Sequence, residues 1–474
     1  MGLGALALAL GMLGSGCASS VAKSFATQHF VSRPDLRPPP IDVLTRAHGT
    51  APGYLFVSPE RGVDQAGPLI LDDHGQVVWF HPVSGHRVTS FRVQRYRGRP
   101  VLTWWSAEAK RGSGHNGVYV IADDHYRIIA TLTAAHGLAA DLHEFLLTPR
   151  GTAVVTAYKK IPYDLSALGG SAHGAVWEGI VQEIDVATGR LLFEWNSIDH
   201  VAVGESYETL PKDPSKTYDY FHINAVDLLP NGHMLVSGRN THAVYDVSRS
   251  NGAVLWRLGG KRSDFSFGPG ARFAWQHDVR LHPGDMLTVF DNASEYAHRG
   301  HPSRGLLLRL DERGRRVTLV HSYRRRRPTL STSEGSDQLL PDGHVLVGWG
   351  SMPFVTEFSR EGRVLLDLRI GSFGARSYRS FRFPWTGHPV TAPAVAVRRG
   401  RHGEIVYASW NGATELKRWR VLAGPDRQHL SSVAEVRKAG FETAIRLGSR
   451  PHIVRVAALD ARGHILRYSN AVAA

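Results

Sequence analysis

The chain has 474 residues, which exceeds one ordinary domain of about 150 residues and predicts two or three domains. Hydrophobic residues make up 42% and charged residues 21%, with 49 Gly and 25 Pro, so the composition excludes disorder and disfavours an all-helical bundle. The net charge is +14, but its only dense run is Arg324 to Arg327 without a basic helix or base-stacking module, which predicts a solvated loop and argues against nucleic-acid binding.

The first 17 residues have the features of an export signal. Gly2 to Leu13 form an apolar stretch too short to span a bilayer, and LGSGC places small residues before Cys17. This pattern resembles a bacterial lipoprotein signal, with Leu13 four residues before the cysteine instead of the usual three. It predicts export and lipidation at Cys17 on the outer face of the cell membrane, with plain secretion or an uncleaved anchor as alternatives. Because Cys17 is the only cysteine, an intrachain disulfide and a Cys-based zinc cluster are excluded.

Residues 18–49 form a lead-in to the main domain. The string SRPDLRPPPI at 32–41 is rich in proline, so we expect this segment to be extended and to cover the surface without entering a core.

From residue 50 onward, two kinds of β-hairpin alternate. The first kind joins two apolar runs by a polar turn ending in Gly, at Gly75, Gly189, Gly252, Gly314 and Gly362. A relative without the glycine, GVYVIADDHYRIIATL, turns near Tyr126 and makes the sixth copy. The second kind has a Pro-Gly or Pro-x-Gly turn, as in VDLLPNGHMLVSGR and DQLLPDGHVLVGWG. Two hairpins give four strands at a period of about 50 to 60 residues, which predicts a six-bladed β-propeller over residues 50–385.

The C-terminal part, residues 390–474, changes character. Its strands alternate without the hairpin pattern, and it resembles a fibronectin type III-like β-sandwich with Trp410 as the core aromatic and HIVRVAALD as a late strand. Such modules are usually spacers or interaction surfaces. The predicted fold class is therefore all-β, with a propeller followed by a small sandwich.

The repeats also predict which residues converge. The first strand of each propeller blade lines a central channel, so equivalent positions at the start of these strands should share one space. Counting back six positions from the turn prolines at 149, 230, 283 and 341 reaches His143, Asn224, His277 and Gly335. His222 lies two residues before Asn224 and should share its face of the strand, and Arg239 ends the strand that pairs with it.

Three histidines in equivalent positions are more informative than one. A single His usually satisfies a local hydrogen bond, but His143, His222 and His277 in blade register, with Asn224 and Arg239 nearby, indicate an oxyanion site. Other polar and aromatic neighbours have simpler interpretations. Asp278 should face away and form a structural ion pair, and the role of Glu334 is left open. Most of the four tryptophans near the channel should be core residues, and at most one or two should contact a substrate: Trp104, Trp105, Trp275 and Trp349.

The motifs that carry these residues resemble a known family. DLHEF at 141–145, YFHINAVDLLPNG at 220–232, SGRN at 237–240 and FAWQHDVR at 273–280 are similar to the arylsulfotransferase family, in particular its actinobacterial and fungal branch. The likeness runs from about residue 30 to residue 385, although the periplasmic branch has a disulfide that this chain cannot form.

The resemblance implies sulfuryl transfer from a phenolic sulfate ester to a phenol, without a nucleotide sulfate donor (3′-phosphoadenosine 5′-phosphosulfate) and without a cofactor. The implied mechanism is ping-pong, through a sulfohistidine on His277. The sulfate-binding residues fall on His222, Asn224 and Arg239, and the further active-site histidine, an acid and base for the phenol oxygen, falls on His143. These residue types suit the chemistry, because a neutral imidazole is a nucleophile near pH 7 and the sulfuryl oxygens need preorganised donors.

Two other functions are compatible with the same residues. The first is a non-catalytic, surface-tethered propeller that binds an anionic ligand or partner without turnover. The second is a metal site, since three His on converging strands can ligate zinc. Arg239 and Asn224 argue against it, because a guanidinium beside a dication is unfavourable, and no metal is expected.

Overall fold

The computed structural model describes residues 27–83, 85–108, 117–293 and 301–474. Within these ranges the protein is built almost entirely of β-strands, which confirms the all-β prediction. Three short 3₁₀ helices occur there, η2 Ser166–Leu168, η3 Ser197–Asp199 and η4 Val203–Glu205. The described part holds no helix with the length and apolar character needed to span a bilayer. The signal segment and Cys17 lie outside the described residues.

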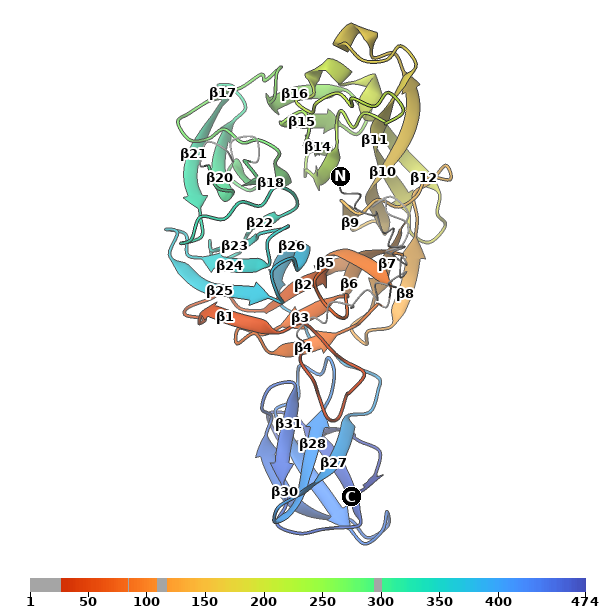
Figure 1. Cartoon of the computed structure of the whole chain (residues 1–474), viewed down its shortest axis with the longest axis vertical. Coiled ribbons are helices and arrows are strands. Elements are labelled where there is room, and N and C mark those ends of the chain that lie inside the picture. The colour runs from red at the N-terminus through yellow and green to blue at the C-terminus, as the bar shows by residue number, and fades with distance from the viewer. Residues whose placement is uncertain (1–26, 84, 109–116, 294–300) are drawn as a thin grey trace, which may run out of the picture.

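Six antiparallel sheets form a ring in Figure 1. The first contains β26 Arg376–Phe383, β2 Tyr54–Glu60, β3 Leu69–Leu71 and β4 Val77–Phe80. The second contains β5 His86–Tyr96, β6 Arg99–Glu108, β7 Val118–Ala122 and β8 Ile128–Leu132. The third contains β9 Phe145–Leu147, β10 Thr152–Tyr163, β11 Gly174–Asp185 and β12 Leu191–Asn196.

The remaining three sheets of the ring follow in chain order. The fourth contains β13 Ile223–Leu228, β14 His233–Gly238, β15 Ala243–Ser248 and β16 Val254–Gly259. The fifth contains β18 His277–His282, β19 Met286–Asp291, β20 Arg304–Asp311 and β21 Arg316–Tyr323, with β17 Ser266–Phe267 parallel to β21. The sixth contains β22 Ser336–Leu339, β23 Val345–Gly348, β24 Phe354–Phe358, β25 Val364–Ile370 and β1 Ile41–Thr45.

Hydrophobic clusters fill the space between each sheet and the next. Phe56 of the first sheet packs with Phe91 of the second, and Leu346 of the sixth packs in one cluster with Leu55 of the first, so the series of packed sheets returns to its start. The four intervening pairs of neighbouring sheets have clusters of the same kind. Every sheet therefore buries both of its faces. This explains why the residues that point to either side of a strand are mostly apolar.

The ring is closed by segments from opposite ends of this region. In the first sheet β26 pairs with β2, with Tyr54 opposite Phe383, and in the sixth β1 pairs with β25, with Ile41 opposite Ile370. The first strands of the sheets meet at the centre: β26 contacts β5, β5 contacts β9, β13 contacts β18, β18 contacts β22 and β22 contacts β26. Residues at the starts of these strands consequently face a common space.

Two sequence expectations need correction. The lead-in does not only cover the surface, because Leu36 is 2% exposed within the core between the sixth and first sheets, and β1 extends the sixth sheet. The arginine run is not wholly a solvated loop either: Arg325 pairs with Asp367 at 2.7 Å and its guanidinium lies 3.5 Å from the ring centre of Phe354. Both differences arise from contacts with residues that are distant in the sequence, which a local sequence pattern does not show.

The C-terminal part forms two further sheets, which lie below the ring in Figure 1. One contains β27 Ala394–Gly400, β28 Gly403–Ser409 and β31 Glu442–Arg446. The other contains β30 Ser431–Arg437, β29 Arg418–Gly424, β32 Ile453–Leu459 and β33 Ile465–Tyr468, with β34 Val472–Ala473 also paired to β32. Trp410 and Trp419 are buried in the core between them.

Candidate active site

The predicted cluster comes together at the starts of the central strands. His143 lies just before β9, His222 just before β13, Asn224 within β13 and His277 at the first position of β18. The ring centres of His143 and His222 are 5.1 Å apart, and the side chain of Asn224 donates to the backbone carbonyl of Gln276, the neighbour of His277, at 2.6 Å. The strand register predicted from the turn prolines therefore describes the actual geometry.

Four residues with strained backbone lie at this cluster. His222, Trp275, Asp278 and Glu334 all have φ between 50° and 64°, in the left-handed region that residues other than glycine seldom occupy. Such conformations persist where the surrounding structure fixes them, and they gather at functional sites.

His143 and His222 each have a carboxylate partner at Nδ1. The Nδ1 of His143 lies 2.7 Å from Asp141, whose carboxylate also accepts the backbone N–H of His143 at 3.0 Å. The Nδ1 of His222 lies 2.5 Å from Asp219. Since an ionised carboxylate only accepts hydrogen bonds, both rings carry a proton on Nδ1. The side chain of His222 is 26% exposed, so this side of the cluster is open to a ligand.

His277 differs because its Nδ1 partner is neutral. Asn292 donates its amide N–H groups to the carbonyls of Ser331 and Glu334, both at 2.9 Å, and this fixes the orientation of the amide. Its Oδ1 therefore faces Nδ1 of His277, at 2.7 Å, and accepts a proton from it. The lone pair of His277 is consequently on Nε2, which accepts the backbone N–H of Glu334 at 3.2 Å.

The environment keeps His277 uncharged. Its side chain is buried, and this burial, followed by the charge of Arg239, lowers the pKa of His277 well below its usual 6.5; the hydrogen bond to Asn292 acts in the opposite direction. At neutral pH the ring is a neutral imidazole with its lone pair on Nε2, which is the form required of a nucleophile.

Arg239 supplies positive charge at the open side of the cluster. Its backbone N–H donates to the carbonyl of His222 at 2.9 Å, and its guanidinium donates to the side chain of Asn240 at 2.7 Å. The contact to the carbonyl of Thr332 is longer, at 3.4 Å, and the guanidinium lies 4.5 Å from the ring centre of Trp275. A half-buried cation with one long hydrogen bond is suited to an anionic ligand.

Comparison with known proteins decides the family. The family model described as Arylsulfotransferase (ASST) matches residues 92–371, more than half of the chain. The chain belongs to the arylsulfotransferase family. The matched residues include His143, His222, Arg239 and His277, and membership indicates an enzyme of the arylsulfotransferase type, with aryl sulfate donors and phenol acceptors as its class of substrate.

The comparison with solved structures gives more distant similarities. A Bacteroides caccae protein of unknown function has a TM-score of 0.40 at 14% identity, covering 70% of this chain and 98% of that one. The Myceliophteria thermophila Cps50 (Swd1) β-propeller domain has a TM-score of 0.36 at 11% identity, with 79% and 98% covered. Catalytically inactive virginiamycin B lyase from Staphylococcus aureus, solved with quinupristin, has a TM-score of 0.35 at 8% identity, with 79% and 96% covered. No curated protein gives a significant match.

In this member of the arylsulfotransferase family, Glu334 contributes to the site by both backbone and side chain. Its backbone contacts His277 and Asn292, and one carboxylate oxygen lies 2.7 Å from Arg376. The other oxygen is buried with no hydrogen-bond partner among the described residues. Burial raises the pKa of Glu334 to about 7, although Arg376 lowers it. The sequence placed Glu334 beside the channel but left its role open.

The sequence reasoning missed the partners that orient the histidines. Asp141 stands two residues before His143 and Asp219 three before His222, so a search for Asp near each His would have found both. Asn292 follows the end of β19 and contacts His277 on the neighbouring strand, and no local sequence pattern predicts this contact. Tyr378 on β26 packs against His143 and His277 and was also missed.

Asp278 and the tryptophans behave largely as expected. Asp278 accepts from Arg280 at 2.8 Å, which confirms the structural ion pair. Trp104, Trp105 and Trp349 are buried core residues. Trp275 is half-buried and lies beneath the Arg239 guanidinium, so it is the member of the four that borders the site.

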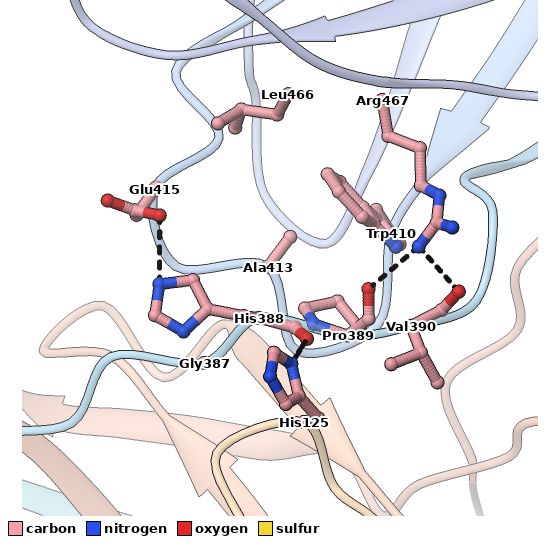
Figure 2. Close-up of a pocket in the computed structure, with 10 residues that line it drawn as sticks. All are labelled: His125, Gly387, His388, Pro389, Val390, Trp410, Ala413, Glu415, Leu466 and Arg467. Atoms are coloured by element: carbon pink, nitrogen blue, oxygen red, sulfur yellow. Dashed lines mark hydrogen bonds and ion pairs between the residues drawn. The ribbon is translucent and has the colours of Figure 1, made fainter.

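The pocket in Figure 2 lies away from this cluster. It has a volume of about 250 Å³ and lies where the ring meets the C-terminal sheets, with Trp410 and Pro389 in its wall. Its polar groups are engaged with one another: His388 contacts Glu415 at 3.1 Å, and Arg467 donates to the carbonyl of Val390. No group of three or more His, Cys, Asp or Glu in the described ranges is arranged to hold a metal ion.

The half-buried His282 predicts how the stability of the protein depends on pH. Burial lowers the pKa of His282, on the same strand as His277, to about 4. The unfolded chain takes up a proton below about pH 6.5 and the folded one does not, so stability is present above pH 6.5 and falls as the pH drops towards 4. We expect His282→Gln to reduce the slope of unfolding free energy against pH by up to about 1.4 kcal/mol per pH unit. Urea denaturation between pH 7 and 4.5 measures this slope, and an unchanged slope contradicts the prediction.

Proposed function

We propose that the protein transfers a sulfuryl group from a phenolic sulfate ester to a phenol through a covalent sulfohistidine on His277, without a nucleotide sulfate donor. The observation that carries the proposal is the state of His277: a buried, neutral imidazole whose Nδ1–H is held by Asn292 and whose lone pair is on Nε2. Family membership supplies the class of reaction.

In the first half-reaction, Nε2 of His277 attacks the sulfur of the donor ester. The S–N bond forms as the S–O bond to the aryl group breaks, and the bonding electrons leave on the phenolic oxygen. His143 enters this step with a second proton, on Nε2, besides the one that its Nδ1 donates to Asp141, and the Asp141 carboxylate balances the charge of that ring. The Nε2 proton passes to the phenolic oxygen and converts it to a phenol. The backbone N–H of Glu334 occupies the Nε2 lone pair of His277 in this structure and has to move aside for the attack.

The second half-reaction reverses these steps with a different phenol. His143 takes the proton of the acceptor as its oxygen bonds to sulfur, and the S–N bond breaks with its electrons returning to Nε2. The sulfuryl group, like a phosphoryl group, spreads charge over its equatorial oxygens in a loose transition state. Arg239, Asn224 and His222 are the donors for these oxygens: Asn224 uses one amide hydrogen on Gln276 and retains a second, and His222, whose Nδ1–H is held by Asp219, donates from Nε2 in its doubly protonated form.

We also propose that the six sheets of the ring are the blades of a β-propeller over residues 50–385, to which β1 Ile41–Thr45 adds a strand in the sixth blade. The closed series of face-to-face contacts and the central meeting of the first strands support this assignment. The actinobacterial and fungal branch of the family remains a proposal based on sequence motifs.

For the ends of the chain, the proposals rest on different observations. The two packed antiparallel sheets with a buried Trp410 support a fibronectin type III-like domain over residues 390–474. Export and lipidation at Cys17, which would hold the enzyme on the outer face of the membrane, rest on the sequence alone.

Mapping the covalent adduct tests the function. We expect that incubation with 4-nitrophenyl sulfate places a sulfuryl group on the tryptic peptide FAWQHDVR, residues 273–280, whose single histidine is His277. Added phenol should discharge the adduct and yield phenyl sulfate. Absence of both adduct and released nitrophenol across several aryl sulfates would contradict the proposal and favour a non-catalytic propeller that binds an anionic ligand.

A further inference from the structure

Tyr378 lies between the two histidines of the proposed chemistry. It is on β26, the strand that closes the ring. This strand lies after residues 92–371, which the family model matches. Its ring meets His143 edge-on, with centres 5.6 Å apart and planes at 76°, and meets His277 at 6.3 Å and 72°. The side chain is only 2% exposed, so packing on all sides fixes its position.

The hydroxyl of Tyr378 is buried with no hydrogen-bond partner among the described residues. Leaving such a group unsatisfied costs stability, so buried hydroxyls are nearly always bonded. The other two tyrosines near the cluster follow that rule: Tyr158 donates to the carbonyl of Ile223 at 2.8 Å, and Tyr119 donates to the carbonyl of Asp141 at 2.7 Å. Tyr378 thus differs from its neighbours in having its polar atom unused.

Burial and nearby carboxylates keep this hydroxyl protonated. Burial raises the pKa of Tyr378 well above 10; Arg379 opposes the rise, and Asp141 and Glu334 add to it. At neutral pH the hydroxyl can therefore act only as an O–H group.

We propose that the Tyr378 hydroxyl donates a hydrogen bond to an oxygen of the transferring sulfuryl group. The proposal rests on the function assigned above. It explains why an enzyme would keep an unsatisfied donor in a packed centre: the partner arrives with the substrate, and the bond is made when negative charge develops on the sulfuryl oxygens. Because no proton is transferred, Tyr378 stabilises charge while His143 exchanges the proton.

Tyr378→Phe removes this hydroxyl and leaves the ring packing in place. We expect kcat for transfer from 4-nitrophenyl sulfate to phenol to fall about 100-fold, as for loss of one oxyanion donor. We expect the midpoint of urea unfolding to stay the same or rise, because the variant no longer buries an unsatisfied hydroxyl. A structural role would move both quantities downward, so the combination is diagnostic.

Tyr158→Phe is the matched control. It removes a hydroxyl that is bonded to a backbone carbonyl beside the same cluster, so we expect a lower unfolding midpoint and a smaller loss of turnover than in Tyr378→Phe. Full turnover in Tyr378→Phe, or a joint loss of turnover and midpoint, would overturn the role of Tyr378 while leaving sulfuryl transfer intact. If the wild-type protein itself releases no nitrophenol, the proposed function fails and the role of Tyr378 fails with it.

Discussion

Replacing His277 with alanine should lower kcat for sulfuryl transfer by about 10⁴-fold or more, the scale on which loss of a catalytic nucleophile acts in other enzymes. The expectation follows from the geometry, since His277 is a buried neutral imidazole whose Nδ1–H is held by Asn292 and whose lone pair is on Nε2. Release of 4-nitrophenol, followed with and without added phenol, measures both half-reactions, and the adduct on residues 273–280 should disappear.

His282→Gln provides the control for that result. His282 ends the same strand, β18, and its Nε2 lies 2.9 Å from the hydroxyl of Thr288, away from the cluster. A general effect of altering a histidine on this strand would lower turnover in both variants. Retention of substantial transfer by His277→Ala would show that another residue carries the sulfuryl group.

The sequence located this cluster because the hairpins repeat. In five sheets the first two strands form one continuous hairpin, so counting from its turn fixed the register of His143, Asn224 and His277. The first sheet has no such hairpin, since its first two strands, β26 and β2, come from opposite ends of the region. The hairpin repeat therefore could not predict that Tyr378, on β26, lies next to the histidines.

Tautomer and charge depend on contacts that a linear pattern does not contain. The Nδ1 atoms of His143 and His222 are hydrogen-bonded to aspartates two and three residues earlier in the chain. The Nδ1 of His277 is instead hydrogen-bonded to the side-chain amide of Asn292, which follows the adjacent strand. A carboxylate at that position would favour an imidazolium, whereas the neutral amide favours a neutral ring with its lone pair on Nε2. The difference between a sulfate-binding histidine and a nucleophile thus lies in the partner, and only the folded arrangement identifies it.

The residue after His143 anchors the same region in a different way. Glu144 is fully buried and accepts from three guanidinium groups: Arg92 at 2.7 Å, Arg280 at 2.6 Å and Arg379 at 3.0 Å. These arginines come from β5, β18 and β26, so a single carboxylate ties together the first strands of three sheets. Burial acts to raise the pKa of Glu144, but Arg280, Arg379 and Arg92 hold it well below its usual range.

Glu144→Gln is accordingly expected to lower the free energy of unfolding by about 3–5 kcal/mol, because removing one partner of a buried ion pair leaves uncompensated charge in the core. The glutamine keeps the shape but not the charge, and its amide nitrogen faces guanidinium groups that can only donate. Urea denaturation at pH 7 measures the loss, and the exposed Glu361→Gln, whose Arg363 contact is 4.0 Å, is expected to unfold at the same urea concentration as the wild type. Equal stability of the two variants would mean that the arginines are neutralised by other carboxylates, such as Asp278, and that Glu144 does not hold the centre of the ring together.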